Sequence, residues 1–206
     1  MAKKDKKQQA DPEQLRRTEP PRLQKRFVDE VRPKVRERFG VGNAMALPRF
    51  EKIVVNVNMG RHLENGKLPA TVKETVLDTL VTISGQKPVV VKAKQSVSNF
   101  KLREGMESSA YVTLRRERMW DFLDRFVNLA APRIRDFRGL PARFDRAGNY
   151  SMGVTEQGVF PEVDMTKTQF THGMNINMVF SNSTPEITRF VLEELGMPFV
   201  KDEKKG

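Results

Sequence analysis

The chain has 206 residues, enough for one domain or two small ones, and 38% of them are hydrophobic, which can support a core. Its 37 lysine and arginine residues exceed its 26 aspartate and glutamate residues, so the formal net charge is +11. This excess favours a polyanionic partner, with nucleic acid as the first candidate and an anionic membrane surface as the second. The absence of cysteine excludes disulfides, thiolate metal sites and cysteine catalysis.

The charge is distributed unevenly along the chain. Residues 1–40 carry 13 basic and 7 acidic side chains and residues 86–118 carry 8 and 3, whereas residues 155–206 carry 5 and 8. This asymmetry favours a defined binding surface over the alternative of charge that serves only solubility. No apolar run is long enough to span a membrane, and the charged first ten residues indicate no signal peptide. We therefore expect a cytoplasmic protein.

The amino-terminal region divides into a tail and a helix. Residues 1–21 are rich in lysine, glutamine and glutamate and contain three prolines, which predicts a disordered basic tail. Apolar residues then recur every four positions from Leu23 to Phe39, as on one face of a helix, and Gly40 suits its carboxyl end. Pro33 is expected to kink or divide this helix.

Several segments have the two-residue period or the β-branched composition of strands. The clearest is residues 51–59, in which Ile53 and Val55 face one way and Asn56 faces the other. The others are residues 89–91, 109–116, 150–154 and 174–180, with a further strand expected after a turn within residues 148–164.

Helical periodicity predicts three more helices, over residues 69–85, 119–132 and 183–196. Helices mixed irregularly with alternating strands indicate an α+β fold, in which helices pack on one face of an antiparallel or mixed sheet. The other face is then open and polar, as expected of an RNA platform. We expect a single domain over residues 22–200, between the tail of residues 1–21 and a charged tail of residues 201–206.

The sequence contains no convincing catalytic or cofactor motif. Residues 60–67 (GRHLENGK) superficially resemble a phosphate-binding loop, but the glycine spacing is wrong and Leu68 stands where a magnesium-binding hydroxyl is needed. His62 and His172 are the only histidines, and a zinc site would need ligands that are absent. No GxSxG sequence exposes a serine nucleophile. We therefore expect no enzyme activity, no cofactor and no metal.

Two basic segments are candidate RNA-binding surfaces. In residues 87–118, Phe100 lies between lysines and arginines, and such cations neutralise phosphates while aromatic rings stack on unpaired bases. Phe100 alone fits a buried core position equally well. The second segment, residues 132–140 (PRIRDFRGL), places three arginines around one phenylalanine, although two of them could also form ion pairs with Asp136. The arginines of this additional basic surface are Arg133, Arg135 and Arg138.

The order of several strings along the chain resembles the family of bacterial ribosomal protein five of the large subunit, which binds 5S ribosomal RNA. The resemblance covers the chain from about Leu23 to Phe199. The matching strings are LPRFEKI (47–53), ISGQKP (83–88), KAKQSVSNFKLREG (92–105), VTLRRERMWDFLDR (112–125), PRIRDFRGL (132–140) and GNYSMGVTEQGVFPE (148–162).

This resemblance implies a curved sheet whose concave side binds 5S RNA in the central protuberance of the large subunit. It also implies contacts with 23S RNA, with transfer RNA in the P site, with a small-subunit head protein and with neighbouring proteins of the central protuberance. The 5S-binding positions that it implies are Asn56, Gln86, Phe100, Thr113 and Arg115. The transfer-RNA loop that it implies contains Lys94, Lys101 and Arg103.

The chain departs from the family pattern at a few positions, and Arg116 stands where glycine is common. Two functions from other classes remain as alternatives. A basic RNA-processing enzyme would need a carboxylate cluster or a histidine acid–base pair, which the sequence does not suggest. A membrane-surface protein would need an amphipathic helix with a basic polar face, for which residues 23–39 are the only candidate. We expect neither membrane binding nor an obligate homo-oligomer.

Overall fold

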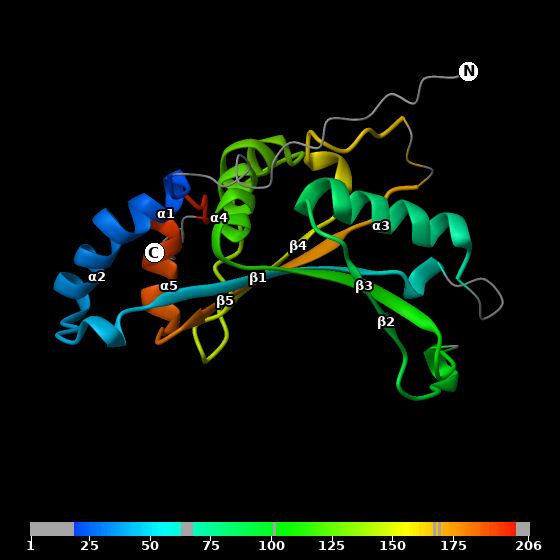
Figure 1. The fold of residues 1–206 in the computed structure, drawn as a ribbon, viewed down its shortest axis with the longest axis horizontal. Helices are drawn as coiled ribbons and strands as arrows, with labels where there is room; N and C mark the ends of the chain where they lie inside the picture. Colours follow the sequence, from blue (N-terminus) through cyan, green and yellow to red (C-terminus); the bar gives the residue numbers. More distant parts are fainter. Residues whose placement is uncertain (1–18, 63–67, 101, 167, 169, 201–206) are drawn as a thin grey trace, which may run out of the picture.

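The protein is a two-layer α+β structure in which helices cover one face of a five-stranded sheet (Figure 1). The structure is a computed structural model. The expected tails fall mostly on residues 1–18 and 201–206, which are outside the described residues. The structure describes residues 19–62, 68–100, 102–166, 168 and 170–200.

The sheet has the strand order β2-β3-β1-β5-β4, and every neighbouring pair is antiparallel. The expected α+β class is therefore confirmed, with the sheet antiparallel rather than mixed. Strands that are distant in the sequence become neighbours on either side of the long central strand β1. The strands are β1 (Arg49–Asn58), β2 (Val89–Lys92), β3 (Glu107–Leu114), β4 (Tyr150–Val154) and β5 (Met174–Ser181).

Alternation along the strands separates a buried face from an open one. On β1, Ile53, Val55 and Val57 are fully buried, while Asn56 between them is half-buried on the other face. The strands β3, β4 and β5 bury every second residue in the same way. Because successive side chains of a strand point to opposite faces, one face of the sheet packs in the core and the other remains polar.

The helices supply the second layer. Figure 1 shows α3 and α4 on one side of the sheet, while α1, α2 and α5 gather at the end where β1 begins. Figure 1 also shows the β2–β3 end of the sheet bending away from α3 and α4, so the open face is concave there. The helices are α1 (Arg22–Arg26), α2 (Arg32–Phe39), α3 (Ala70–Ser84), α4 (Arg116–Arg125) and α5 (Pro185–Glu194).

Aromatic rings join α4 and the helical turn that follows α1 to the sheet. Phe50 of β1 stacks on Phe180 of β5 with ring centroids 4.5 Å apart. Trp120 of α4 lies edge-on to Phe50 at 5.3 Å and contacts Phe27 at the same distance. All four rings are buried, so this cluster contributes both apolar area and specific ring geometry to the core.

The expected first helix is continuous but not uniformly α-helical. A five-residue π-helical turn, Phe27–Val31, joins α1 to α2, and Pro33 follows it in the first turn of α2. Pro33 has no N–H to donate to the preceding turn, and the wider turn lies where this α-helical hydrogen bond is missing. A repeat of four residues exceeds the 3.6 residues of an α-helical turn, and a wider turn corrects the resulting drift. The apolar positions therefore stay on the core side, from Leu23 to Val35.

The prediction of a second strand, after the turn within residues 148–164, is wrong. After β4 the chain forms a 3₁₀ turn, Gln157–Val159, and further turns. Gln157 is fully buried there; its Oε1 accepts a hydrogen bond from the backbone N of His172 at 2.6 Å, and its Nε2 donates to the carbonyl of Phe170 at 2.8 Å. A buried amide thus satisfies backbone groups that a strand ladder would otherwise have paired.

The strand expected over residues 109–116 ends earlier than predicted. β3 stops at Leu114, Arg115 remains extended as the residue that caps α4, and Arg116 begins the helix with φ +52°. This left-handed conformation is the one that glycine adopts without steric cost. It gives a physical reason for glycine at this position, where this chain has arginine.

Replacing Arg116 with glycine is expected to raise the free energy of unfolding by about 0.5–1 kcal/mol, because relief of the left-handed strain exceeds the added backbone entropy of glycine. Urea denaturation measures the change. Arg118→Gly, the same replacement inside α4, is the matched control and should destabilise by about 1 kcal/mol. Equal destabilisation by both variants would contradict the assignment of strain to Arg116.

Within the described ranges, no helix is long and apolar enough to cross a membrane.

Candidate nucleic-acid interface

The open face of the sheet presents rows of polar side chains that cross the strands. In one row Asn56 lies between Tyr111 of β3 and Asn175 of β5, and Gly153 of β4 follows Asn175. The next row contains Thr113, Val54, Asn177 and Ser151. None of these residues is buried. The strand register therefore produces a solvent-accessible polar surface that extends over four strands.

The electrostatic character of this surface follows from its composition. Beyond the first residues of β1, where Arg49 and Glu51 are exposed, the outward-facing residues of the four strands include one lysine and no arginine. Their one carboxylate is Glu107 at the start of β3, which forms an ion pair with Lys73 of α3. Such a surface does not repel a polyanion, and its amide and hydroxyl groups can both donate and accept hydrogen bonds. These outward-facing residues are Lys52, Val54, Asn56, Asn58, Glu107, Ser109, Tyr111, Thr113, Ser151, Gly153, Asn175, Asn177 and Val179.

Three of the expected 5S-binding residues lie close together at one end of β3. Gly85 ends α3 in a left-handed conformation, and the next residue, Gln86, donates from its Nε2 to the backbone carbonyl of Thr113 at 3.3 Å. Arg115 lies two residues after Thr113, and it is extended and exposed. The helix end thus brings Gln86 to the strand, which no local sequence pattern indicates.

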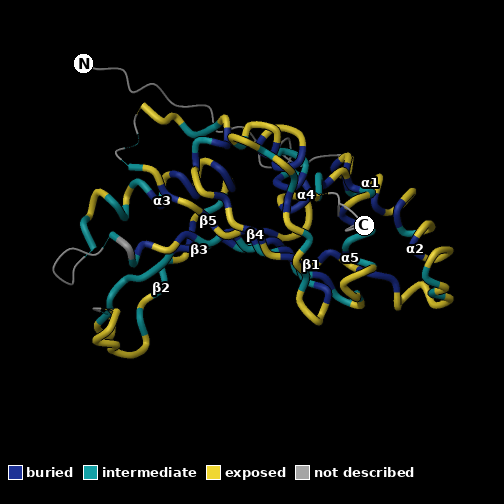
Figure 2. The backbone as a smooth tube through the Cα atoms, turned by 180° about the vertical axis from the view of Figure 1, so that it is seen from behind, coloured by how far each residue is buried: buried dark blue, intermediate teal, exposed yellow. Residues whose placement is uncertain are grey.

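The fifth residue, Phe100, lies on the loop between β2 and β3. Its side chain is 76% exposed, so the alternative of a core position is wrong. The loop is held in a hairpin-like form by paired hydrogen bonds between Val97 and Leu102 and by one from the N–H of Ala93 to the carbonyl of Met106. Figure 2 shows the loop coloured as exposed along most of its length. The ring of Phe100 is therefore available to a ligand.

The same loop carries basic side chains. Lys94 and Arg103 are exposed, and Lys101 lies outside the described residues. In Figure 1 the loop extends from the β2–β3 end of the sheet, on the side away from α3 and α4. The structure thus places Lys94 and Arg103 beyond the polar rows rather than within them.

The structure does not bring the additional basic surface to the open face. Arg133, Arg135 and Arg138 are all exposed. Among the described residues neither Arg135 nor Arg138 forms an ion pair with Asp136, so the structural alternative for these two arginines is wrong. Phe137, which lies between Arg135 and Arg138 in the sequence, lines a cleft together with Leu23 of α1. This segment therefore lies beside the helical layer, away from the polar rows.

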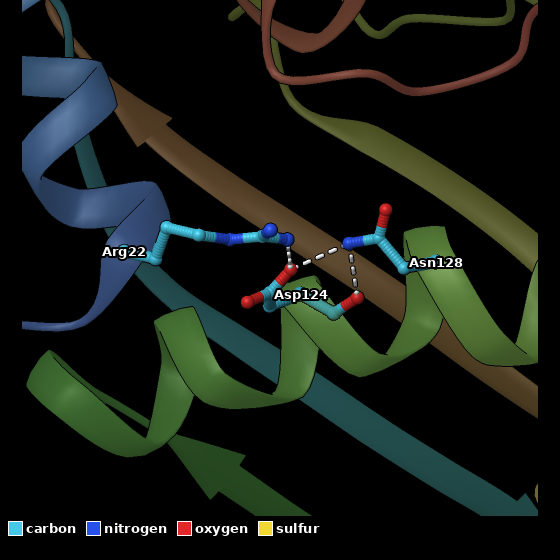
Figure 3. Close-up of polar contacts among 3 residues, drawn as sticks. All are labelled: Arg22, Asp124 and Asn128. Atoms are coloured by element: carbon cyan, nitrogen blue, oxygen red, sulfur yellow. Dashed lines mark hydrogen bonds and ion pairs between the residues drawn. The ribbon is translucent and has the colours of Figure 1, made fainter.

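One ion pair joins α1 to α4 beside that segment. The guanidinium of Arg22 donates to Asp124 at 2.6 Å, and Asn128 donates to the backbone carbonyl of Asp124 at 2.9 Å (Figure 3). Because Arg22 is largely exposed, we expect the ion pair to contribute orientation more than stability.

Sequence reasoning missed Asn175 and Asn177. The period of β5 was recognised from its buried residues, Met174 and Ile176, and the same alternation places the asparagines on the open face. The period alone indicates that they face away from the core. Only the pairing of β5 with β1 shows that they are neighbours of Asn56.

The two histidines, which are far apart in the sequence, are close in space. The ring centroid of Phe170 is 4.8 Å from that of His62 and 5.6 Å from that of His172. His172 is buried, and burial, followed by the nearby charge of His62, lowers its pKa to about 4. Among the described residues, no three histidine, aspartate or glutamate side chains are grouped so that they could hold a metal ion.

An open polar sheet face beside an exposed aromatic and basic loop is typical of an RNA-binding protein. Comparison with known proteins agrees. Residues 43–103 match the family described as Ribosomal protein L5, and residues 107–199 match the model that describes the C-terminus of the same ribosomal family. The chain belongs to the ribosomal protein L5 family.

Curated relatives resemble the chain over nearly their whole length. Large ribosomal subunit protein uL5 of Caldanaerobacter subterraneus subsp. tengcongensis is 48% identical over 181 residues, which cover 87% of this chain and 99% of that protein. The proteins of the same name from Alkaliphilus oremlandii and Kocuria rhizophila are 49% and 47% identical, again over 87% of this chain, and over 99% and 93% of their own lengths.

Family membership confirms several expectations from the sequence. The protein is a structural component of the large ribosomal subunit rather than an enzyme, and it associates with ribosomal RNA in translation. Its expected location on the cytoplasmic ribosome agrees with this family.

Proposed function

We propose that this protein anchors 5S ribosomal RNA in the central protuberance of the large subunit through the open face of its sheet. The convergence of Gln86, Thr113 and Arg115 at the end of β3, with Asn56 on the adjacent strand, is the observation that carries this proposal. These residues combine one exposed cation with neutral hydrogen-bonding groups. The cation supplies affinity for phosphate, while the neutral groups select hydroxyls and base edges.

The loop between β2 and β3 has two parts in this proposal. Phe100 stacks on an unpaired base of the 5S RNA, for which its 76% exposure leaves the ring free. Lys94, Lys101 and Arg103 contact the transfer RNA in the P site. The exposure of Lys94 and Arg103 on this loop supports the contact, because it leaves both cations free to neutralise phosphates.

The surface beside the helical layer serves other partners. Arg133, Arg135 and Arg138 contact 23S RNA, and the absence of an ion pair with Asp136 among the described residues supports this role. We further propose a bridge to a protein of the small-subunit head and contacts with neighbouring proteins of the central protuberance. A single chain suffices for these contacts, so we propose no obligate homo-oligomer.

Replacing Arg115 with alanine tests the 5S site. The variant is expected to bind 5S RNA more weakly by about 1–3 kcal/mol, because a charge-assisted contact is lost. It should remain folded, since the side chain is exposed and outside the core. If Arg115 contacts a phosphate, the slope of log affinity against log salt should also fall by about one unit. Titration of labelled 5S RNA at several salt concentrations measures both effects.

A double variant of the loop is the matched control for loss of positive charge. Lys94→Ala with Arg103→Ala removes two exposed cations and is expected to leave 5S affinity within about threefold, or roughly 0.7 kcal/mol. A loss above about a hundredfold would show that these two cations contact 5S RNA rather than transfer RNA. An unchanged affinity for Arg115→Ala would remove the 5S site from this end of β3.

A further inference from the structure

We propose that the RNA-binding surface continues past β1 onto β5 and β4, with Asn175 and Asn177 as additional RNA-contacting residues. Their ligands are ribose 2′-hydroxyl groups and base edges rather than phosphates. This inference rests on the proposed function, because it extends the same face of the sheet. The inference adds strands β5 and β4 to the binding surface. The resemblance to the family indicated no binding residue on these two strands.

The register of the strands places these asparagines beside the expected site. Asn175 is the direct partner of Asn56 across the β1–β5 pair, and Asn177 is the partner of Val54. Thr113 lies opposite Val54 on the other side of β1. Asn175 and Asn177 therefore prolong the two rows that contain Asn56 and Thr113. Directly opposed side chains on a sheet are about 5 Å apart, so one ligand can contact both members of such a pair.

The amide groups are free to bind a ligand. Asn175 is exposed and Asn177 is half-buried, and neither side chain forms a hydrogen bond within the part of the chain that the structure describes. Other asparagines of the protein behave differently. The side chain of Asn149 accepts from the N–H of Phe180, and that of Asn43 accepts from the N–H of Met45. Those asparagines have structural partners, whereas Asn175 and Asn177 have none among the described residues.

Small residues on β4 keep the surface accessible. Gly153 lies opposite Asn175, and Ser151 lies opposite Asn177. Gly153 does not have a positive φ, so its backbone does not require glycine. A Cβ atom at this position would lie 3.5 Å from the Oδ1 of Asn175, an ordinary contact, so packing does not require glycine either. The missing side chain instead leaves the amide of Asn175 uncovered for a closely approaching ligand.

The chemistry of the surface selects the kind of ligand. A carboxamide has two donor hydrogens and one acceptor oxygen, which match the donor and acceptor character of a 2′-hydroxyl and of base edges. It carries no charge with which to neutralise phosphate. The shallow groove of an A-form RNA helix displays these groups, and DNA lacks the 2′-hydroxyl. The β5–β4 half of the face therefore fits the minor groove of paired RNA.

Affinity for 5S RNA measured at several salt concentrations tests the inference. Asn175→Ala and Asn177→Ala are each expected to weaken binding by about fivefold, and the double variant by roughly 25-fold. The salt slope should not change, because no cation is removed, in contrast to Arg115→Ala. Asn128→Ala, which removes an asparagine amide from the helical layer, is the matched control and should leave binding unchanged.

A second variant keeps the shape of the side chains. Asn175→Asp with Asn177→Asp places two negative charges on the face and is expected to weaken binding by more than about a hundredfold. Thermal melts of every variant check that the fold is retained. Full binding by both double variants, together with weakened binding by Arg115→Ala, would overturn the inference while leaving the proposed function in place. Failure of the unmodified protein to bind 5S RNA would overturn both.

Discussion

Replacing Leu114 with alanine is expected to lower the free energy of unfolding by about 2–5 kcal/mol, because the change leaves a cavity in the core. Leu114 is fully buried at the end of β3, where it pairs with the equally buried Ile53 of β1. It immediately precedes Arg115, yet it faces the helical layer rather than solvent. Urea denaturation followed by circular dichroism measures the loss.

The neighbouring position provides the control. Thr113 is half-buried on the open face, so Thr113→Ala is expected to cost less than about 1 kcal/mol of stability and to weaken RNA binding instead. The fraction of the Leu114→Ala variant that remains folded should bind 5S RNA with unchanged affinity. If Leu114→Ala stayed fully stable but lost RNA binding, the open face would not be the RNA-binding face.

The fold was largely predictable because its elements have strong local periods. The alternation of Ile53, Val55 and Val57 predicts β1, and the spacing from Leu23 to Val35 predicts the first helix, including the face that it buries. The strand expected near residue 157 failed for a different reason. Gln157 forms tertiary hydrogen bonds with Phe170 and His172, and no local pattern indicates such bonds.

The candidate site was less predictable because it depends on which strands are neighbours. Alternation placed Asn56 and Thr113 on a polar face, and the structure confirms both positions. The resemblance to the family was needed for Gln86, whose contact with Thr113 depends on how α3 ends beside β3. Asn175 lies more than a hundred residues from Asn56 in the sequence, so only the sheet order makes it part of the same surface.

Burial of His172 makes the stability of the protein depend on pH. The pKa of His172 is about 4 in the folded protein, because burial and then the nearby charge of His62 disfavour its protonation, and its unperturbed pKa is 6.5. Between these values the unfolded chain binds a proton that the folded chain does not. Protonation of His172 in the unfolded chain therefore does not lower the free energy of unfolding above pH 6.5, and it lowers that free energy progressively as the pH falls toward 4. The expected loss over this range is on the order of 3 kcal/mol.

The contribution of this residue can be separated from that of the titrating carboxylates by substitution. His172→Phe keeps the ring beside Phe170 and the backbone N–H that donates to Gln157, but it cannot bind a proton. Neither ring nitrogen of His172 has a hydrogen-bond partner among the described residues, so no side-chain hydrogen bond is removed there. Urea denaturation at about pH 7, 6 and 5 should show a smaller fall in stability for His172→Phe than for the unmodified protein. Equal falls, or an NMR titration of His172 with a midpoint near its unperturbed pKa of 6.5, would contradict the burial of a neutral imidazole.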